Sequence, residues 1–409
     1  MRAVLTITLI ISLVGCAAHE GAAPAESATV SATPTPRTAP AGITGTAATS
    51  AVSKAGDSPP STTTIGCSNG SRLATWSVNQ LAEQTVIVPV AENDTGSVKS
   101  EVAAGAGGVI LFGASAPANL AADLKRLDAV APNSIAPLVM TDEEGGYVQR
   151  MANVVGSIAS AREMGVTMTP AQIRQVALRL ARRMRATGVT MDLAPVLDVD
   201  GGQGPNDQDP DGTRSFSGVE SIASADGLAF AAGLEAGGIM PVVKHFPGLG
   251  GATGNTDVTP ASTPPWSTLE RIGLSPFEAA VEAQIPAVMV ANASVPGLTN
   301  LPASISPEVI TGVLRGRLGY QGLVISDSLS AVALSAIGYS VPKAAVAAVA
   351  AGADMVIYNA NPLTVAALTS ETAAALVAAV HTGELDRSRL VSAVTHVLAA
   401  KGVDLCRAG

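Results

Sequence analysis

The sequence predicts an α/β domain of the (β/α)₈-barrel class, in which eight parallel strands alternate with helices. The first observation behind this prediction is the pattern from residue 73 onward, where short apolar runs alternate with segments of helical periodicity. The second is that several of these runs end in polar residues, as strands do where a barrel builds a site. The strands are expected at residues 86–90, 108–112, 137–141, 190–193, 240–244, 287–291, 322–326 and 355–358.

Helices are expected between most of these strands, at residues 120–130, 171–187, 222–236, 269–283, 307–318 and 343–351. Residues 363–400 are expected to form the helices that close the domain. An open, doubly wound sheet is the alternative arrangement, but no Gly-x-Gly-x-x-Gly pattern follows the first strand. The sequence shows no internal repeat and no second domain, so we assign residues 65–409 to one TIM-type barrel.

The chain begins with a predicted lipoprotein signal peptide at residues 1–15. Arg2 supplies its positive charge, and the apolar run at residues 3–14 is too short to remain as a membrane-spanning helix. The run ends in Leu13-Val14-Gly15-Cys16, which is similar to a bacterial lipobox, so Cys16 is expected to carry a lipid. The alternative is an ordinary signal peptide with an incidental cysteine.

Residues 16–64 are rich in Ala, Ser, Thr and Pro and are expected to form a disordered tether. The barrel would then lie in the cell envelope, outside the cytoplasm, anchored to the membrane by the lipid on Cys16. The remaining cysteines, Cys67 and Cys406, flank the barrel, and two such cysteines usually pair outside the cytoplasm. Two free thiols are the alternative.

The composition narrows the expected partners. The 409 residues carry a net charge of −9 without any basic block, so nucleic acid is not expected to bind. No cluster of His, Asp and Cys has the spacing of metal ligands, and we predict neither a metal nor another cofactor. A monomer is expected.

Polar side chains follow three of the predicted strands. Lys244 and His245 follow the apolar run 238–243, and Asp142 and Asp327 come directly after two other runs. The carboxyl ends of barrel strands meet at one end, so these groups are expected to converge on an active site. The structural alternative for the aspartates is capping of the next helix. Long polar insertions at residues 198–217 and 248–265 also follow strands, and loops of that length are often functional.

Five motifs lie between residues 73 and 400. They are Asp142-Glu143-Glu144-Gly145-Gly146 with Gln149-Arg150, Ala194-Pro195-Val196-Leu197-Asp198-Val199, Arg214-Ser215-Phe216, Lys244-His245-Phe246-Pro247-Gly248, and the run 322–326 followed by Asp327. Together they make the chain similar to the β-N-acetylhexosaminidases of glycoside hydrolase family 3, in the single-domain bacterial (NagZ-like) type. The resemblance implies a retaining hydrolase that acts on N-acetylglucosamine-containing glycans.

The resemblance also implies roles for individual residues. Asp327 matches the family's nucleophile, and a carboxylate suits the formation of a covalent glycosyl-enzyme; a cap on a helix at residues 329–336 is the alternative. The residues that match the sugar-binding set are Asp142, Arg150, Arg214, Lys244 and His245. Structural ion pairs remain the alternative for Lys244 and the two arginines, and a buried, hydrogen-bonded histidine for His245.

The loop after Gly248 departs from the family pattern. The family has a His there, followed by an Asp-Ser-His sequence whose last His is the general acid/base and whose Asp orients it. Here Leu249 replaces the first His, Asn255 the Asp, and Asp257 the acid/base His, and no other histidine is placed to take over. Asn292 and Tyr147 also stand where the family often has a His and an Arg.

These departures leave three hypotheses. The first is a membrane-anchored β-N-acetylglucosaminidase with Asp327 as nucleophile and Asp257 as substitute acid/base, acting on cell-wall or chitin-like saccharides. The second is a pseudoenzyme of the same fold that binds such glycans without turnover. The third is a glycoside phosphorylase, which an anionic Asp257 disfavours because it would repel phosphate.

Overall fold

Eight parallel strands close into a barrel in the computed structural model, which describes residues 68–407 of the chain. The strands are β1 (Val86–Ala91), β2 (Gly108–Phe112), β3 (Leu138–Thr141), β6 (Met191–Asp192), β7 (Met240–Phe246), β8 (Ala287–Val290), β11 (Leu323–Ser328) and β12 (Met355–Ile357). They follow one another around the barrel in chain order, and the ring closes where Val86 of β1 pairs with Val356 of β12. The predicted fold and all eight predicted strands are confirmed.

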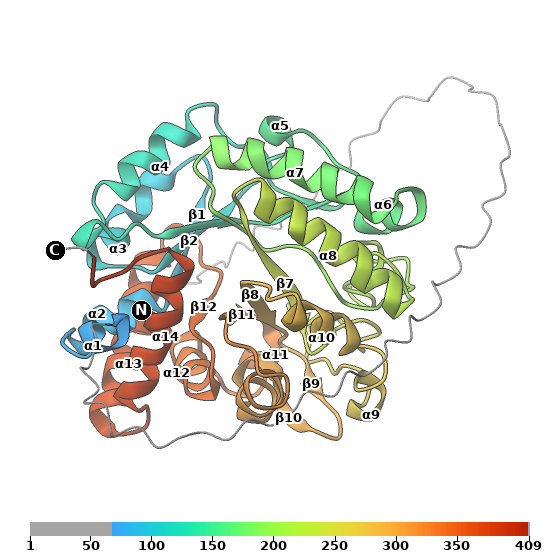
Figure 1. Cartoon of the computed structure of the whole chain (residues 1–409). Helices are drawn as coiled ribbons and strands as arrows, with labels where there is room; N and C mark the ends of the chain where they lie inside the picture. The colour runs from blue at the N-terminus through green and yellow to red at the C-terminus, as the bar shows by residue number, and fades with distance from the viewer. Residues whose placement is uncertain (1–67, 408–409) are drawn as a thin grey trace, which may run out of the picture. The chain divides into compact units, whose positions relative to one another are not determined.

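Helices surround these strands (Figure 1). The longer ones are α2 (Val78–Gln84), α3 (Lys99–Ala104), α4 (Leu120–Asp128), α6 (Ala161–Thr167), α7 (Pro170–Ala186), α8 (Glu220–Ala236), α10 (Ser275–Glu282), α12 (Val341–Ala351), α13 (Val365–Thr382) and α14 (Arg387–Ala400). Short elements complete the layer: α1 (Asn69–Leu73), α5 (Ala152–Val155), α9 (Trp266–Leu269) and α11 (Val332–Ser335). Two antiparallel hairpins lie outside the barrel, β4 (Glu143–Gly145) with β5 (Val148–Gln149), and β9 (Ser294–Val295) with β10 (Thr299–Pro302).

Local sequence explains where helices begin. Thr169 caps α7 by accepting a hydrogen bond from the backbone of Gln172, whose side chain reaches back to the cap, and Pro170 occupies the first turn. The helix predicted at residues 269–283 is instead divided, because α9 ends at Leu269 and α10 begins at Ser275 with Pro276 in its first turn. The segment Glu308–Arg317 is helical as predicted, but of the π type.

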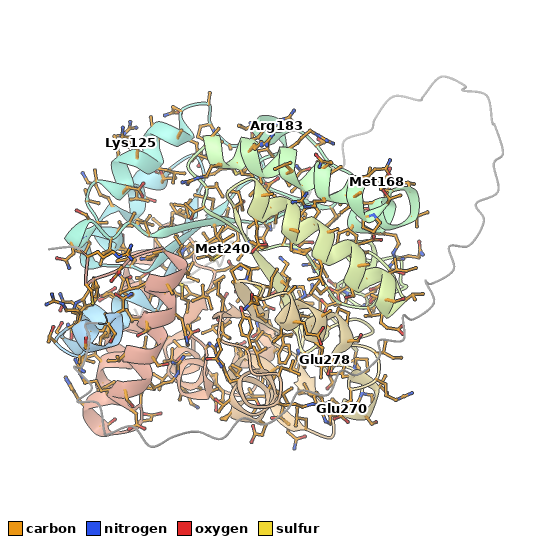
Figure 2. The ribbon with its side chains drawn as sticks, viewed as in Figure 1. Lys125, Met168, Arg183, Met240, Glu270 and Glu278 are labelled. Carbon is orange, nitrogen blue, oxygen red and sulfur yellow. The ribbon has the colours of Figure 1, made fainter. Side chains whose placement is uncertain are left out.

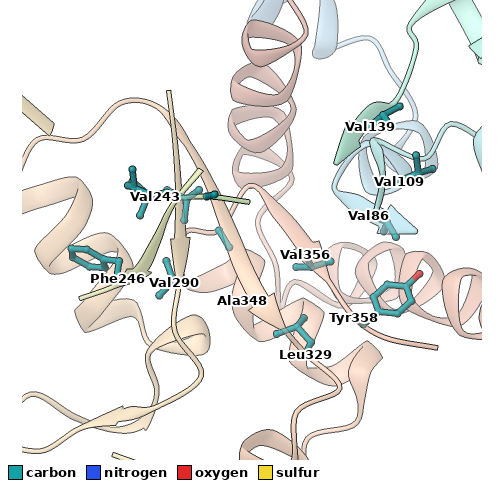
Figure 3. Packing of buried hydrophobic residues seen from close by; sticks show 14 of the residues in the cluster. Val86, Val109, Val139, Val243, Phe246, Val290, Leu329, Ala348, Val356 and Tyr358 are labelled. Carbon is teal, nitrogen blue, oxygen red and sulfur yellow. The ribbon is translucent and has the colours of Figure 1, made fainter. Parts of the chain in front are cut away.

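The core has two layers that follow the period of two along the strands. Ile87 of β1 points into the barrel with large side chains such as Ile110, Met140 and Ile325. The alternate positions face the helices and belong to the outer layer, which is rich in valine. Figure 3 shows part of this outer layer, with Val86, Val109 and Val139 from neighbouring strands.

Charged side chains lie on the outside of the helical layer. Lys125 of α4, Arg183 of α7 and Glu270 are exposed, whereas Met240, at the start of β7, packs against the barrel interior (Figure 2). The helix α13 is long and apolar enough to cross a membrane by length and composition alone, but it packs against α12, α2 and β1. The predicted signal peptide, Cys16 and the tether lie outside the described residues.

The two ends of the described domain are joined. The side chain of Asn69 donates a hydrogen bond to the carbonyl of Val403 at 2.7 Å and accepts one from the backbone of Leu405 at 2.8 Å. Cys406 is disulfide-bonded. Cys67 lies outside the described residues, so the pairing of Cys67 with Cys406 stays a prediction.

Asp354 is a buried carboxylate that connects three elements just before β12. It accepts hydrogen bonds from Arg315 at 2.6 Å, from Arg389 at 2.8 Å, from His396 at 3.0 Å and from the backbone of Val324 at 2.9 Å. Burial alone would raise the pKa of Asp354, but the hydrogen bond from His396 and the two arginine charges lower it. The ionised carboxylate therefore stabilises the barrel at neutral pH.

We expect Asp354→Ala to reduce the free energy of unfolding by about 3–5 kcal/mol, because two arginines lose their buried partner. Denaturant unfolding of the folded chain measures the loss. The matched control is Glu270→Ala, which removes an exposed partner of Arg317 and should cost less than about 1 kcal/mol. Equal effects of the two substitutions would contradict the role of Asp354. Because its folded pKa is lowered, this contribution should persist above the unfolded pKa and disappear as the pH falls through the folded one.

Candidate active site

A pocket of about 230 Å³ opens at the carboxyl ends of the barrel strands. All seven residues that the sequence analysis selected line it: Asp142, Arg150, Arg214, Lys244, His245, Asp257 and Asp327. They come from β7, β11, the segment after β3 and the two long insertions. Their convergence follows from the parallel barrel, which gathers the carboxyl end of every strand at one face.

Lys244 is buried at the base of the pocket between two carboxylates. Its Nζ lies 2.9 Å from Oδ1 of Asp142 and 2.7 Å from Oε1 of Glu144. Arg214 donates two parallel hydrogen bonds to Glu144, both at 2.8 Å. Burial alone would raise the pKa of Glu144, but the charges of Arg214 and Lys244 hold it well below its usual range. Lys244 and Arg214 therefore do form ion pairs, as the structural alternative predicted, and both residues also line the pocket.

Arg150 differs from the other two cations because it forms no ion pair with any residue between 68 and 407. Its guanidinium lies 5.9 Å from the ring centroid of Phe112, and its buried Nε has no hydrogen-bond partner. An unpaired cation of this kind can donate to a ligand in the pocket. The described residues therefore give no support to the ion-pair alternative for Arg150.

His245 is held by Asp198, a residue for which the sequence analysis proposed no role. The Nδ1 of His245 lies 2.7 Å from Oδ2 of Asp198, and the backbone N–H of His245 donates to the same oxygen at 3.0 Å. Burial, followed by the charge of Arg214, lowers the pKa of His245 to about 4. The imidazole is therefore neutral at neutral pH, and the same side chain is both a satisfied buried histidine and part of the pocket wall.

Asp327 is the second-to-last residue of the barrel strand β11 and is half-buried. Its Oδ1 accepts a hydrogen bond of 2.7 Å from the backbone of Ser328. The following helix α11 begins only at Val332 and has Ala331 as its N-cap residue, so the capping alternative for Asp327 is wrong. Burial raises the pKa of Asp327, and the nearby Asp257 raises it further.

Asp257 stands at the mouth of the same pocket, on the insertion after β7, and is exposed. The backbone carbonyls of Thr256 and Asp257 accept hydrogen bonds from Ala333 and Val332 at 3.0 and 3.4 Å, so the loop docks on α11. Partial burial raises the pKa of Asp257, and the charge of Arg214 opposes this rise. The Asp257 carboxylate accepts no hydrogen bond from the described residues. Asn255 contacts the backbone of Asp257, whose N–H donates to the Asn255 side chain at 2.9 Å.

The two long insertions form one wall of the pocket, as their length suggested. Their backbones are joined by a hydrogen bond from Asn255 to Asp207 at 2.9 Å. Gly251 donates to the side chain of Asp200 at 3.1 Å. Gly250 lies so close to the other insertion that a Cβ there would meet the carbonyl of Val199 at 2.3 Å. These contacts hold Asp257 over the pocket.

The two other departures from the family pattern do not line the pocket. Asn292 is buried, donates to the carbonyl of Ser328 at 2.7 Å and accepts from Ser304 at 2.6 Å, so it braces the segment after Asp327. Tyr147 is 78% exposed at the tip of the β4–β5 hairpin.

Glu144, Asp198 and Asp211 are contributors that sequence reasoning missed, although the first two lie inside quoted motifs. Asp198, Asp211 and His245 are all buried, and ligand-type atoms of the three lie within 4.8 Å of one another. Their spacing in the sequence gave no signal because they approach only in the fold. These three side chains could in principle ligate a metal, but the positive charge of Arg214, 3.7 Å from Asp211, opposes a cation among them. The predicted absence of a metal stays a prediction.

Comparisons with known proteins show what the whole chain is similar to. Residues 78–400 match the model of the Glycosyl hydrolase family 3 N terminal domain. Beta-hexosaminidase LpqI of Mycobacterium tuberculosis is 36% identical over 280 residues, which cover 67% of this chain and 70% of that protein. An uncharacterized secreted glycosyl hydrolase of Arthroderma benhamiae is 34% identical over 284 residues, 66% of this chain and 78% of that protein.

Solved structures are also similar to this chain. The crystal structure of beta-N-acetylhexosaminidase from Beutenbergia cavernae superposes with a TM-score of 0.73 at 30% identity and covers 81% of this chain and 100% of that one. The match to the family model spans the whole barrel, and the identity with the Mycobacterium protein extends over most of both chains. On this ground the resemblance predicted from the five motifs is confirmed, and the chain belongs to glycosyl hydrolase family 3.

Proposed function

We propose that this protein is a retaining β-N-acetylglucosaminidase that cleaves cell-wall or chitin-like saccharides. The observation that carries the proposal is the pairing of two carboxylates, Asp327 and Asp257, in one pocket with different surroundings. Two such groups across a sugar-sized pocket suit a double displacement at the anomeric carbon. The names of the relatives, beta-hexosaminidase and beta-N-acetylhexosaminidase, support the same substrate class.

The surroundings of Asp327 and Asp257 indicate which of them is the nucleophile and which is the acid/base. Asp327 receives the hydrogen bond from Ser328, and the charge of Lys244 favours its ionised form. Asp257 has no hydrogen-bond donor among the described residues, so its ionised form is less well stabilised and a shared proton resides on it. Like charges close together resist joint ionisation, which keeps one proton on the pair.

The reaction then proceeds in two steps. The Asp327 carboxylate forms a bond to C1 of the sugar while the glycosidic C1–O bond breaks, and the leaving oxygen takes the proton of Asp257. In the second step the ionised Asp257 takes a proton from water, the water oxygen bonds to C1, and Asp327 is released. Asp142, Arg150, Arg214, Lys244 and His245 hold the sugar by hydrogen bonds to its hydroxyls and its N-acetyl carbonyl.

The binding-only alternative is favoured by one observation, the exposure of Asp257 together with the loss of an orienting partner at Asn255. A phosphorylase is disfavoured because Asp257 and Asp327 place negative charge where phosphate would enter.

The functional test is release of 4-nitrophenol from the 4-nitrophenyl β-glycosides of N-acetylglucosamine and of glucose. We expect the N-acetylated substrate to be preferred, and Asp327→Asn to lower kcat by about 10³-fold or more because no covalent intermediate forms. Equal cleavage of the glucoside would reject the substrate class. Turnover of the variant above about a tenth of wild type would reject Asp327 as nucleophile. No turnover by wild type between pH 4 and 8 would leave the binding-only function.

The role of Asp257 is tested with leaving groups of different quality. Asp257→Ala should slow methyl or phenyl N-acetylglucosaminides by about 10²-fold and 4-nitrophenyl glycosides by less than about tenfold, because only poor leaving groups need the proton. The matched control is Asp207→Ala, an exposed carboxylate of the neighbouring insertion, which should change neither class.

The same variant should change the pH profile of kcat/KM. The acidic limb reports ionisation of Asp327, and it should stay nearly where it is because Asp257 is protonated and uncharged in that pH range. The alkaline limb reports loss of the proton from Asp257, and it should disappear. An unchanged profile would show that Asp257 is not the acid/base.

We further propose that Cys16 anchors the protein to the membrane through a lipid, so that the barrel acts outside the cytoplasm. The lipobox-like sequence that ends at Cys16 and the relative described as secreted support this location. Cys16→Ser should move the protein from the sedimented membrane fraction to the soluble one, because a lipid chain supplies the membrane affinity. The control is Cys67→Ser, which should leave the fractionation unchanged. Continued sedimentation of the Cys16 variant with membranes would point to another anchor.

A further inference from the structure

Asp198 is a fully buried carboxylate that accepts three hydrogen bonds from the segment beginning at His245. Its Oδ2 accepts from the backbone N–H and from Nδ1 of His245, at 3.0 and 2.7 Å, and its Oδ1 accepts from the backbone of Leu249 at 2.6 Å. Because Asp198 is the acceptor in these contacts, Nδ1 of His245 carries a hydrogen. The neutral imidazole then has its lone pair on Nε2, the nitrogen that lies 3.5 Å from Nη2 of Arg214.

A second carboxyl group, that of Asp211, lies beside this contact. Asp211 is 0% exposed, and neither of its oxygens accepts a hydrogen bond. Arg214 and His245 each have a nitrogen near Asp211, at 3.7 and 3.8 Å from its Oδ1, too far for a hydrogen bond. An ionised carboxylate in this position would be desolvated without adequate compensation.

A proton on Asp211 removes this difficulty. A carboxylate has about four lone-pair positions, and Asp198 uses three of them for His245 and Leu249. The protonated Asp211 can therefore donate to Asp198, since carboxylate oxygens of the two residues lie within 4.8 Å of each other. Burial raises the pKa of Asp211 well above its usual value, and the adjacent Asp198 adds to the rise, which agrees with this assignment.

We propose that Asp198 and Asp211 share one proton and act as a positioning pair, which holds His245 as a neutral imidazole whose Nε2 accepts a hydrogen bond from a hydroxyl of the bound sugar. The sugar in this statement rests on the proposed function; the shared proton and the state of His245 do not. Neither aspartate touches the reacting atoms.

The charges around the pair determine how binding responds to pH. Arg214 and Lys244 disfavour a charged His245, whereas Asp211 and Asp327 favour one. Asp200 adds negative charge beside Asp211. When the pair loses its proton at alkaline pH, a second negative charge appears 3.7 Å from Arg214, which draws this cation away from Glu144 and the pocket. Sugar binding should therefore weaken as the pH rises through the loss of this proton.

The first experiment uses nitrogen NMR of the chain labelled with ¹⁵N-histidine. The chain has four histidines, and His245→Asn identifies the signals of His245. We expect a neutral ring with the hydrogen on Nδ1 between pH 5 and pH 8. A ring with the hydrogen on Nε2, or one that titrates near its ordinary pKa of about 6.5, would overturn the proposal. Asp198→Leu removes the acceptor of Nδ1–H and should bring out the Nε2–H form; an unchanged tautomer in that variant would also reject the proposal.

The second experiment measures the affinity for N-acetylglucosamine by calorimetry between pH 5 and pH 9. Wild type should lose at least tenfold in affinity across this range. In Asp211→Asn the amide donates to Asp198 at every pH, so the loss should fall below threefold. The matched control Asp207→Asn changes an exposed carboxylate of the same insertion and should keep the wild-type decline. A wild-type decline in Asp211→Asn would overturn the shared proton.

The two experiments separate this proposal from the proposed function. If no variant and no wild-type sample binds N-acetylglucosamine at any pH, the substrate assignment fails, and the NMR measurement on the free chain still decides the state of His245. Circular dichroism of Asp211→Asn and Asp198→Leu checks that each variant is folded before either measurement.

Discussion

The buried ammonium of Lys244 is the constraint on which the rest of the site depends. A charge of this kind is tolerated only when partners replace the water it has lost, and Asp142 and Glu144 do so from the segment after β3. Glu144 in turn requires Arg214 from the insertion after β6. The network thus connects three parts of the chain across the barrel mouth. Removing one member leaves an uncompensated charge, so the pocket and the loops around it form together.

Carboxyl groups next to the pocket residues are also buried, which disfavours their ionised form. Burial raises the pKa of Glu143 from 4.5 to about 7, and it raises the pKa of Asp192 well above its usual value. A carboxyl group with a raised folded-state pKa contributes stability that is fully present below its unfolded pKa and is lost as the pH rises through the folded one. For Glu143 this window runs from 4.5 to about 7. These groups favour the fold at mildly acidic pH, in the opposite direction to Asp354, and such conflicts gather where a structure serves chemistry rather than stability.

The sequence was sufficient for the strands and for the side chains that follow them, because both depend on local patterns. Apolar runs marked β7 and β11, and the polar residues directly after them had to meet at one barrel face. The partners of those residues could not be predicted, because charge pairing depends on contacts between residues far apart, such as Lys244 and Asp142, which are separated by 102 positions. The shared burial of Asp198 and Asp211 is of the same kind. The break between α9 and α10 was missed for a local reason, because the helical periodicity continued through the turn that precedes Pro276.

The contacts of Asn69 have a consequence for the connectivity of the barrel. Its side chain bonds both to Val403 and to Leu405, and Arg387 of α14 donates to the carbonyl of Ala74 at 3.0 Å, so the first and last parts of the described domain are already adjacent. The strands close into a ring, and the two ends of the described domain lie next to each other. A short linker between residues 68 and 407 would span this junction, and new ends could be opened in an exposed loop elsewhere. The fold therefore does not depend on where the barrel sequence is opened, and a circularly permuted chain should form the same barrel.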